Sequence, residues 1–191
     1  MNLGRYGRSW QVLLMCLCVL LCQANSARGG ESRRPTSHEL LGAWRLVRIE
    51  LSGPSGSIVD PFYQADSTGI IIYDSSGWMS VQIVAPQRPP FEVPASRASP
   101  AATAATAQDA PLKAAAFDTY YAYFGTWNYD EATSVVTHHV KSALIPAETG
   151  LSYAQKISFE GGRMIFTVRS GNKRQEIVRR KIWERIPGTG T

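Results

Sequence analysis

Two adjacent histidines, His138 and His139, are the residues in this sequence with the most obvious capacity for chemistry. Neighbouring side chains of a β-strand point to opposite faces, so the two imidazoles cannot act on the same atom. His138 shares its face with Val136 and Val140, which places it on the interior side of a strand. There it could transfer a proton, orient a bound molecule, or serve as a structural histidine with satisfied hydrogen bonds.

A second polar feature is the basic run Arg179-Arg180-Lys181 near the C-terminus. If Arg179 and Lys181 face solvent, strand alternation turns Arg180 inward with Val178 and Ile182. A buried guanidinium needs a carboxylate partner. The partner is either the acid group of a ligand or a protein carboxylate in a salt bridge at the end of the fold, and the sequence leaves both open.

Other chemistry-bearing patterns are missing from the sequence. It contains no nucleophile beside a base, no glycine-rich phosphate loop and no paired catalytic carboxylates at a recognisable spacing. His38 is the only histidine besides the adjacent pair, and no Cys lies near any of them in sequence, so no zinc-ligand spacing occurs. We therefore expect neither a metal ion nor a cofactor.

Residues 1–27 have the order of a secretory signal peptide. Arg5 and Arg8 precede an apolar run over 10–22, and small residues follow with cleavage expected after Ala24 or Ala27. The run is shorter than the roughly 20 residues that cross a bilayer. We expect a secreted or periplasmic protein without a stable membrane anchor after cleavage; an uncleaved anchor is the alternative. All three cysteines lie in this leader, so no disulfide can form in the mature chain.

Length and charge bound the rest of the chain. Its 191 residues predict a short linker at 28–38 and one domain at 39–187, because a chain of that length can bury a sufficient core. The formal charge is +5, and the leader contributes part of it through Arg5 and Arg8. This mild excess does not resemble the clustered basic surface of a nucleic-acid-binding protein. The oligomeric state is not predicted.

Strand and turn signals recur about every ten residues over most of the domain, as in an antiparallel meander. The predicted strands are 44–51, 69–73, 78–84, 123–129, 135–143, 153–159, 163–169 and 175–186. Eight antiparallel strands can close into a barrel that holds side chains or one small ligand. An Ala/Pro-rich flexible loop is expected at 92–107, followed by one inserted α-helix at 110–123 that covers the barrel as a lid or plug.

The closed end of this barrel is predicted from Gly42 and Trp44. A glycine before a large aromatic lets the backbone turn tightly, and the indole then caps the core. Arg185 on the last strand can cover that indole as a cation. These three residues are therefore expected to be structural, although Trp44 could equally be an ordinary core residue of an edge strand.

Five blocks carry a resemblance to a known family: LGAWRL at 41–46, GWMSVQ at 77–82, RPPF at 88–91, YYAYFGTW at 120–127 and VTHHV at 136–140. In this order they resemble the lipocalin-like domain family of bacterial and fungal proteins over about residues 39–185. The resemblance implies an all-β fold, an eight-stranded antiparallel up-and-down barrel of the calycin type, with an internal pocket.

The expected function is binding of a small hydrophobic or amphipathic molecule inside the barrel by an exported protein. The alternative is a cofactor-independent isomerase or cyclase that acts on a hydrophobic substrate in the same pocket, with His138 or a tyrosine moving a proton. The residues expected to line the pocket are Met79, Val81, Gln82, Tyr120, Tyr123, Trp127, His138 and Arg180. Gln82 lies opposite the apolar face of its strand, so it enters this set only if a ligand turns that face inward.

Overall fold

The computed structural model describes residues 32–60, 62–64, 66–86, 88, 110–172 and 174–188. The expected signal peptide 1–27, residues 28–31 of the linker and the Ala/Pro-rich loop 92–107 lie outside these residues. Among the helices that are described, none has the length and apolar character needed to cross a membrane.

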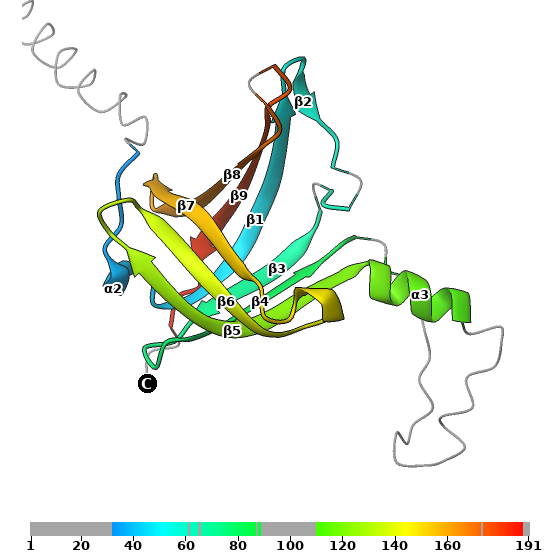
Figure 1. The fold of residues 1–191 in the computed structure, drawn as a ribbon, viewed down its shortest axis with the longest axis horizontal. Coiled ribbons are helices and arrows are strands. Elements are labelled where there is room, and N and C mark those ends of the chain that lie inside the picture. Colours follow the sequence, from blue (N-terminus) through cyan, green and yellow to red (C-terminus); the bar gives the residue numbers. More distant parts are fainter. Residues whose placement is uncertain are drawn as a thin grey trace, which may run out of the picture. The chain divides into compact units, whose positions relative to one another are not determined.

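The described strands form one antiparallel sheet that closes on itself (Figure 1). They are β1 (Gly42–Gly53), β2 (Gly56–Ile58), β3 (Thr68–Tyr73), β4 (Trp78–Val84), β5 (Tyr120–Asp130), β6 (Val135–Ala143), β7 (Ser152–Glu160), β8 (Arg163–Ser170) and β9 (Ile177–Arg185). Consecutive strands pair from β3 to β9, and β1 joins β3 to β9. Because β2 pairs only with the far end of β1, eight strands make the barrel, which confirms the predicted fold class.

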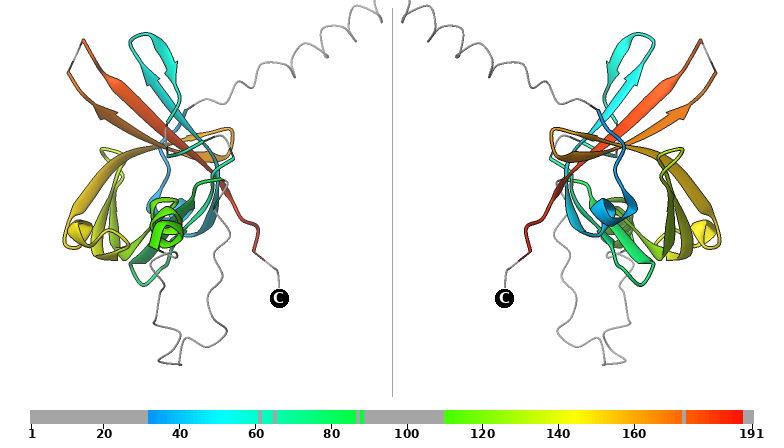
Figure 2. Two further views of the ribbon diagram at one scale, coloured as in Figure 1. Left: turned by 90° about the vertical axis from the view of Figure 1, so that its right-hand side faces the viewer. Right: turned by 90° about the vertical axis from the view of Figure 1, so that its left-hand side faces the viewer.

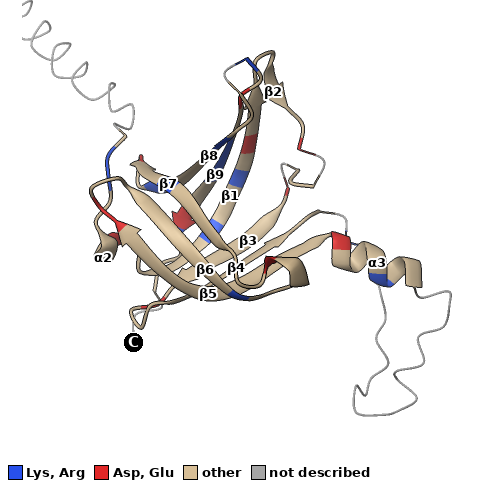
Figure 3. Cartoon of the chain, in the orientation of Figure 1, with Lys and Arg blue, Asp and Glu red and all other residues tan. Residues whose placement is uncertain are grey.

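Alternation of apolar and polar residues explains why these strands close around a core. On β4 the side chains of Met79, Val81 and Ile83 are buried, whereas Trp78 and Gln82 on the other face are exposed. The core continues through the interior faces of the other strands, with large buried residues from β1, β3, β6, β7, β8 and β9. Charged residues gather on β1, β8 and β9, while β3 and β4 carry none (Figure 3).

A bulge in β6 shifts the pairing between β5 and β6, because Lys141 has no partner on β5. The register between β5 and β6 shifts between Phe124 and Gly125. Gly125 is buried there, and a Cβ atom at this position would collide with the backbone carbonyl of His139. Only glycine lets the two backbones approach this closely.

One end of the barrel is closed by the short helix α2 (Ser37–Leu40) and by Trp44. Trp44 is 1% exposed, and its indole Nε1 donates to the Leu40 carbonyl at 2.9 Å. The Arg185 guanidinium lies 4.2 Å from the centroid of the indole. It also donates to the carbonyl oxygens of Leu41, at 2.6 Å, and Glu39.

The turn before Trp44 depends on glycine. Gly42 has a φ of +109°, and a Cβ at this position would lie 2.9 Å from the Arg185 side chain. A side chain there would therefore be strained twice, by its backbone conformation and by the cation that covers the indole. Gly42, Trp44 and Arg185 form one structural unit at the closed end.

The inserted helix α3 (Ala110–Asp118) is shorter than the predicted 110–123, and the prediction was wrong at its C-terminal end. The Thr119 hydroxyl donates to the Ala115 carbonyl at 2.6 Å as the helix ends. Tyr120 and Tyr123 belong to β5, where they pair with β4. None of the α3 residues is buried, so this helix does not act as the lid that the sequence suggested; it lies beyond the end of β4 and β5 (Figure 1).

Candidate functional site

A cavity of about 390 Å³ lies between residues of β5, β7, β8 and β9. It is lined by Tyr121, Tyr123, Ser152, Tyr153, Ala154, Gln155, Val168, Arg179 and Lys181. The ladder between β7 and β8 begins only at Lys156 and Thr167, so residues 152–155 have no partner on β8. The hairpins β1–β2 and β8–β9 extend away from β5, β6 and β7 in this region (Figure 2). The cavity therefore forms where the barrel wall separates.

Two cations of β9 face this cavity. Arg179 and Lys181 share the interior face of the strand with the buried Trp183. Arg179 Nη2 lies 3.1 Å from Oδ2 of the buried Asp60, and the guanidinium lies 5.7 Å from the centroid of the Tyr63 ring. Its Nε atom is buried and has no hydrogen-bond partner among the described residues. Asp60 thus neutralises Arg179 without using all of its donors.

The half-buried ammonium of Lys181 forms no hydrogen bond or salt bridge with the described residues. Burial, together with the neighbouring positive charge of Arg179, lowers the pKa of Lys181 to about 8. Lys181 therefore remains mainly protonated at neutral pH, as an unpaired positive charge on the cavity wall.

Tyrosine rings form the apolar part of the wall. Tyr121 and Tyr153 each pack against Tyr123 edge to face, with centroid distances of 5.6 and 5.8 Å. The Tyr121 hydroxyl donates to Glu148 Oε2 at 3.1 Å, and burial raises the pKa of Tyr121 well above its ordinary value. These rings stay neutral and offer apolar surface beside the two cations.

His138 lies directly behind Tyr123 and is fully buried. Its Nδ1 atom lies 2.7 Å from the Tyr123 hydroxyl and its Nε2 atom 2.6 Å from the Tyr73 hydroxyl. Burial lowers the pKa of His138 to about 3, and the positive charge of Lys181 adds to the effect. His138 is therefore neutral, and both of its ring nitrogens are used within the protein.

The other predicted pocket residues of the interior do not line the cavity. Met79 and Val81 are buried in the packed core. The Trp127 ring packs on Tyr73 at a centroid distance of 4.7 Å, and its Nε1 donates to the Asp74 carbonyl at 3.2 Å. Of the residues expected to form the pocket, Tyr123 lines the cavity. His138 does not line it but contacts the Tyr123 hydroxyl.

Tyr120 was predicted to line the pocket, and Gln82 was predicted to do so only if a ligand turned its face inward; the structure places both side chains on the outer face. Gln82 is exposed on the outer face of β4, where its Oε1 accepts a hydrogen bond of 2.6 Å from the Tyr120 hydroxyl. The apolar residues of β4 fill the other face, which leaves Gln82 outside. The interior at β4 is already packed by Met79, Val81 and Ile83.

The inward orientation predicted for Arg180 was also wrong. Its guanidinium lies on the outer face, 3.0 Å from Glu50 Oε2 and 2.6 Å from Glu160 Oε2. The apolar neighbour Ile182 misled the assignment, because it is buried on the outer face opposite Ile165. Arg180 therefore forms the protein salt bridge that the sequence left as the alternative.

Sequence reasoning missed Tyr121, Tyr153, Gln155, Arg179 and Lys181. The positions of the two tyrosines could have been found from strand periodicity. Tyr121 shares a strand face with Tyr123, and Tyr153 shares one with the apolar Ile157. Arg179 and Lys181 lie on the same face of β9 as the buried Trp183, four and two residues away. The sequence does not reveal whether the face with Trp183 or the face with Ile182 points to the core.

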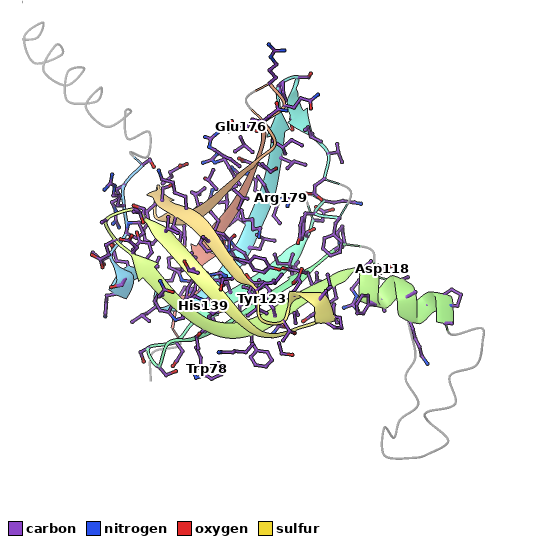
Figure 4. The ribbon with its side chains drawn as sticks, in the orientation of Figure 1. Trp78, Asp118, Tyr123, His139, Glu176 and Arg179 are labelled. Atoms are coloured by element: carbon purple, nitrogen blue, oxygen red, sulfur yellow. The ribbon has the colours of Figure 1, made fainter. Side chains whose placement is uncertain are left out.

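A second hollow of about 230 Å³ lies over the outer face of β4, β5 and β6, lined by Ser80, Gln82, Ala122, Tyr123, Phe124, Ser142, Ala143 and Leu144. The exposed rings of Trp78 and Phe124 lie next to each other on this face, with centroids 6.5 Å apart. Figure 4 labels Trp78 at the outer surface and Tyr123 inside the barrel. In the described part of the chain, no three His, Cys, Asp or Glu residues cluster as metal ligands do.

The fold and the cavity together define a class, the closed up-and-down β-barrels with an internal cavity. The sequence model of the lipocalin-like domain family matches residues 41–186, and the chain belongs to this family. The match spans the barrel from β1 to β9 and confirms the resemblance carried by the five sequence blocks. Searches among curated proteins and among solved structures gave no match.

The burial of neutral His138 predicts a pH dependence of stability. Its pKa is about 3 in the folded chain and 6.5 when exposed, so the unfolded chain binds more protons between these values. The free energy of unfolding should therefore fall as pH is lowered from 6.5 towards 3, with a contribution of up to about 1.4 kcal/mol per pH unit. Urea unfolding of the wild type and His138→Gln between pH 4 and 7 measures it.

The variant His139→Gln is the matched control, because His139 lies on the outer face with Asn128 and Ser152 as partners. We expect it to retain the wild-type slope, whereas the slope of His138→Gln should be shallower. Parallel curves for the wild type and His138→Gln would contradict the burial of a neutral imidazole.

Proposed function

We propose that this protein binds a small amphipathic molecule in the barrel cavity, with the polar end of the ligand beside Arg179 and Lys181. The observation that carries the proposal is the unpaired Lys181 ammonium on the wall of a cavity of about 390 Å³. A charge of this kind is costly to bury unless a partner of opposite charge is present for at least part of the time. A bound anion would supply that partner.

The apolar part of the ligand would lie against the tyrosine rings and Val168. Cavities of a few hundred Å³ with a mainly apolar lining and a few polar groups are typical of small-molecule sites. An eight-stranded barrel has room for one such ligand. The lipocalin-like fold supports this class of function in general terms.

The isomerase or cyclase alternative receives less support from the geometry. A general base must reach the proton that it removes. His138 is separated from the cavity by Tyr123, and both of its ring nitrogens already contact tyrosine hydroxyls. We therefore place the binding function first.

Calorimetric titration with straight-chain carboxylic acids of 6 to 14 carbons tests the proposal. Each added methylene should contribute about 0.8 kcal/mol, or about a fourfold gain in affinity, until the cavity is full. We expect the gain to stop within this series, because the cavity is closed by the core around His138 on one side. Affinity that rises without a limit would indicate adsorption to the outer surface, and absence of binding would contradict the proposal.

We also propose that the protein acts outside the cytoplasm, because residues 1–27 have the sequence pattern of a cleaved signal peptide. The mature chain would then lack Cys16, Cys18 and Cys22. The intact mass of protein recovered from the culture medium or periplasm tests this. A full-length chain that carries three thiols and is recovered from the membrane would contradict it.

A further inference from the structure

The direction of the hydrogen bonds around His138 follows from its surroundings. A neutral imidazole has one N–H donor and one acceptor nitrogen, so one tyrosine hydroxyl donates to it and the other accepts from it. Both contacts are short, 2.6 Å from Nε2 to Tyr73 and 2.7 Å from Nδ1 to Tyr123. The two tyrosines therefore have opposite roles.

Tyr73 must be the donor. It is 1% exposed, and its hydroxyl has no hydrogen-bond partner other than His138 among the described residues. A proton on Nε2 would leave the Tyr73 hydroxyl proton buried without an acceptor, which is the more costly arrangement. The Tyr73 hydroxyl thus donates to Nε2, and the imidazole proton is on Nδ1.

Tyr123 must then be an acceptor towards the protein. Its oxygen accepts the Nδ1 proton of His138. The amide nitrogen of Gln155, which lies 3.5 Å from Nδ1, also donates to this hydroxyl oxygen. The hydroxyl proton of Tyr123 finds no acceptor among the described residues. Because Tyr123 lines the cavity, that proton is free for a group bound there.

The charged groups of the wall are donors as well. Lys181 offers an ammonium without a partner, and Arg179 offers a buried Nε without a partner. The nearby carboxylates are engaged, Asp60 by Arg179 and Glu148 by Tyr121. The charged groups that lack a partner in this cavity are therefore all donors.

We infer that Tyr123 is a specificity-determining donor, held in that role by Tyr73 and His138, and that the cavity selects a ligand whose polar end is an oxygen acceptor without a proton, a carboxylate. This rests on the proposed function and adds the ligand class to it. Tyr123 recognises the acceptor oxygen whatever its charge, whereas Lys181 recognises the negative charge. His138 and Tyr73 are positioning residues, since they act through Tyr123.

Three probes of equal chain length separate these roles: decanoate as a charged acceptor, 2-decanone as a neutral acceptor and decylammonium as a donor. The wild type should bind decanoate most tightly and decylammonium least. Tyr123→Phe should weaken decanoate and 2-decanone alike, by about fivefold to tenfold, as the loss of one hydrogen bond does. Lys181→Met should weaken decanoate alone. Tyr120→Phe, which alters a tyrosine of the outer face, is the matched control and should change neither affinity.

The tautomer is read independently by ¹⁵N NMR of the wild type with labelled histidine. The inference requires that Nδ1 of His138 carries the proton; a proton on Nε2 overturns it, because Tyr123 would then donate to His138. Unchanged decanoate and 2-decanone affinities in Tyr123→Phe overturn it as well. If no probe binds the wild type, the proposed function fails, and the tautomer still decides the orientation of Tyr123.

Discussion

Trp44→Ala is expected to lower the free energy of unfolding by about 3–5 kcal/mol, as large-to-small changes of buried aromatic residues do. The indole is 1% exposed and meets the Phe159 ring edge to face at a centroid distance of 5.6 Å. Its removal also leaves the Leu40 carbonyl without its donor and exposes the guanidinium of Arg185 to a cavity. Urea unfolding of the purified variant measures the loss. Trp78→Ala is the matched control, because Trp78 is 49% exposed, and it should cost less than about 1 kcal/mol.

Arg185→Ala should cost less than Trp44→Ala, since a cation over an indole contributes about 0.5–2 kcal/mol. The two carbonyl hydrogen bonds of Arg185 add to its loss. The double variant should be more stable than the sum of the single effects predicts, because the contact between the two side chains is removed only once. Additive effects would mean that Arg185 does not act through the indole.

Lys181→Met is expected to weaken the binding of decanoate by about 10-fold to 100-fold, the range for a charge-assisted hydrogen bond of about 1.5–3 kcal/mol. The same change should leave or raise the free energy of unfolding, because it removes a partly buried charge that has no salt-bridge partner among the described residues. A loss of binding without a loss of stability separates a ligand role from a structural one. Arg180→Met, which removes a cation of the outer face, is the control and should bind decanoate as the wild type does.

The pH dependence of decanoate binding gives a second measure of Lys181. Its pKa is about 8 in the free protein, so the ammonium is lost as pH rises through this value and affinity should fall between pH 8 and 10. The groups that act on Lys181 are Arg179, Asp60, Glu148 and His138, and the pKa of about 3 keeps His138 neutral throughout this range. Affinity in Lys181→Met should be flat over the same interval. Equal pH profiles for both proteins would contradict the assignment.

The barrel could be predicted from the sequence because strands such as β4 alternate between apolar and polar residues and several turns contain glycine. The closed end could be predicted as well, since Gly42, Trp44 and Arg185 carry the geometry in their types and positions. The helix was extended too far because Tyr120 and Tyr123 fit a helical stripe, whereas aromatic residues next to β4 pair more favourably as a strand.

The cavity could not be located in this way, because β9 has apolar residues on both faces. Ile182 is buried outside the barrel against Ile165, and Trp183 is buried inside it. A one-residue choice between these sets moves every charged side chain of the strand to the other face. That choice exchanged Arg180 for Arg179 and Lys181. The separation of β7 from β8, which creates the space, depends on pairing that no local pattern encodes.

The central claim is that the interior cavity binds a small amphipathic acid, and intermolecular nuclear Overhauser effects from ¹³C-labelled decanoate test it most directly. We expect contacts from the alkyl chain to the ring protons of Tyr121 and Tyr153 and to the methyl groups of Val168, which line the cavity. Contacts confined to Trp78 and Phe124, beside the outer hollow, would contradict the claim and place binding on the surface of the barrel.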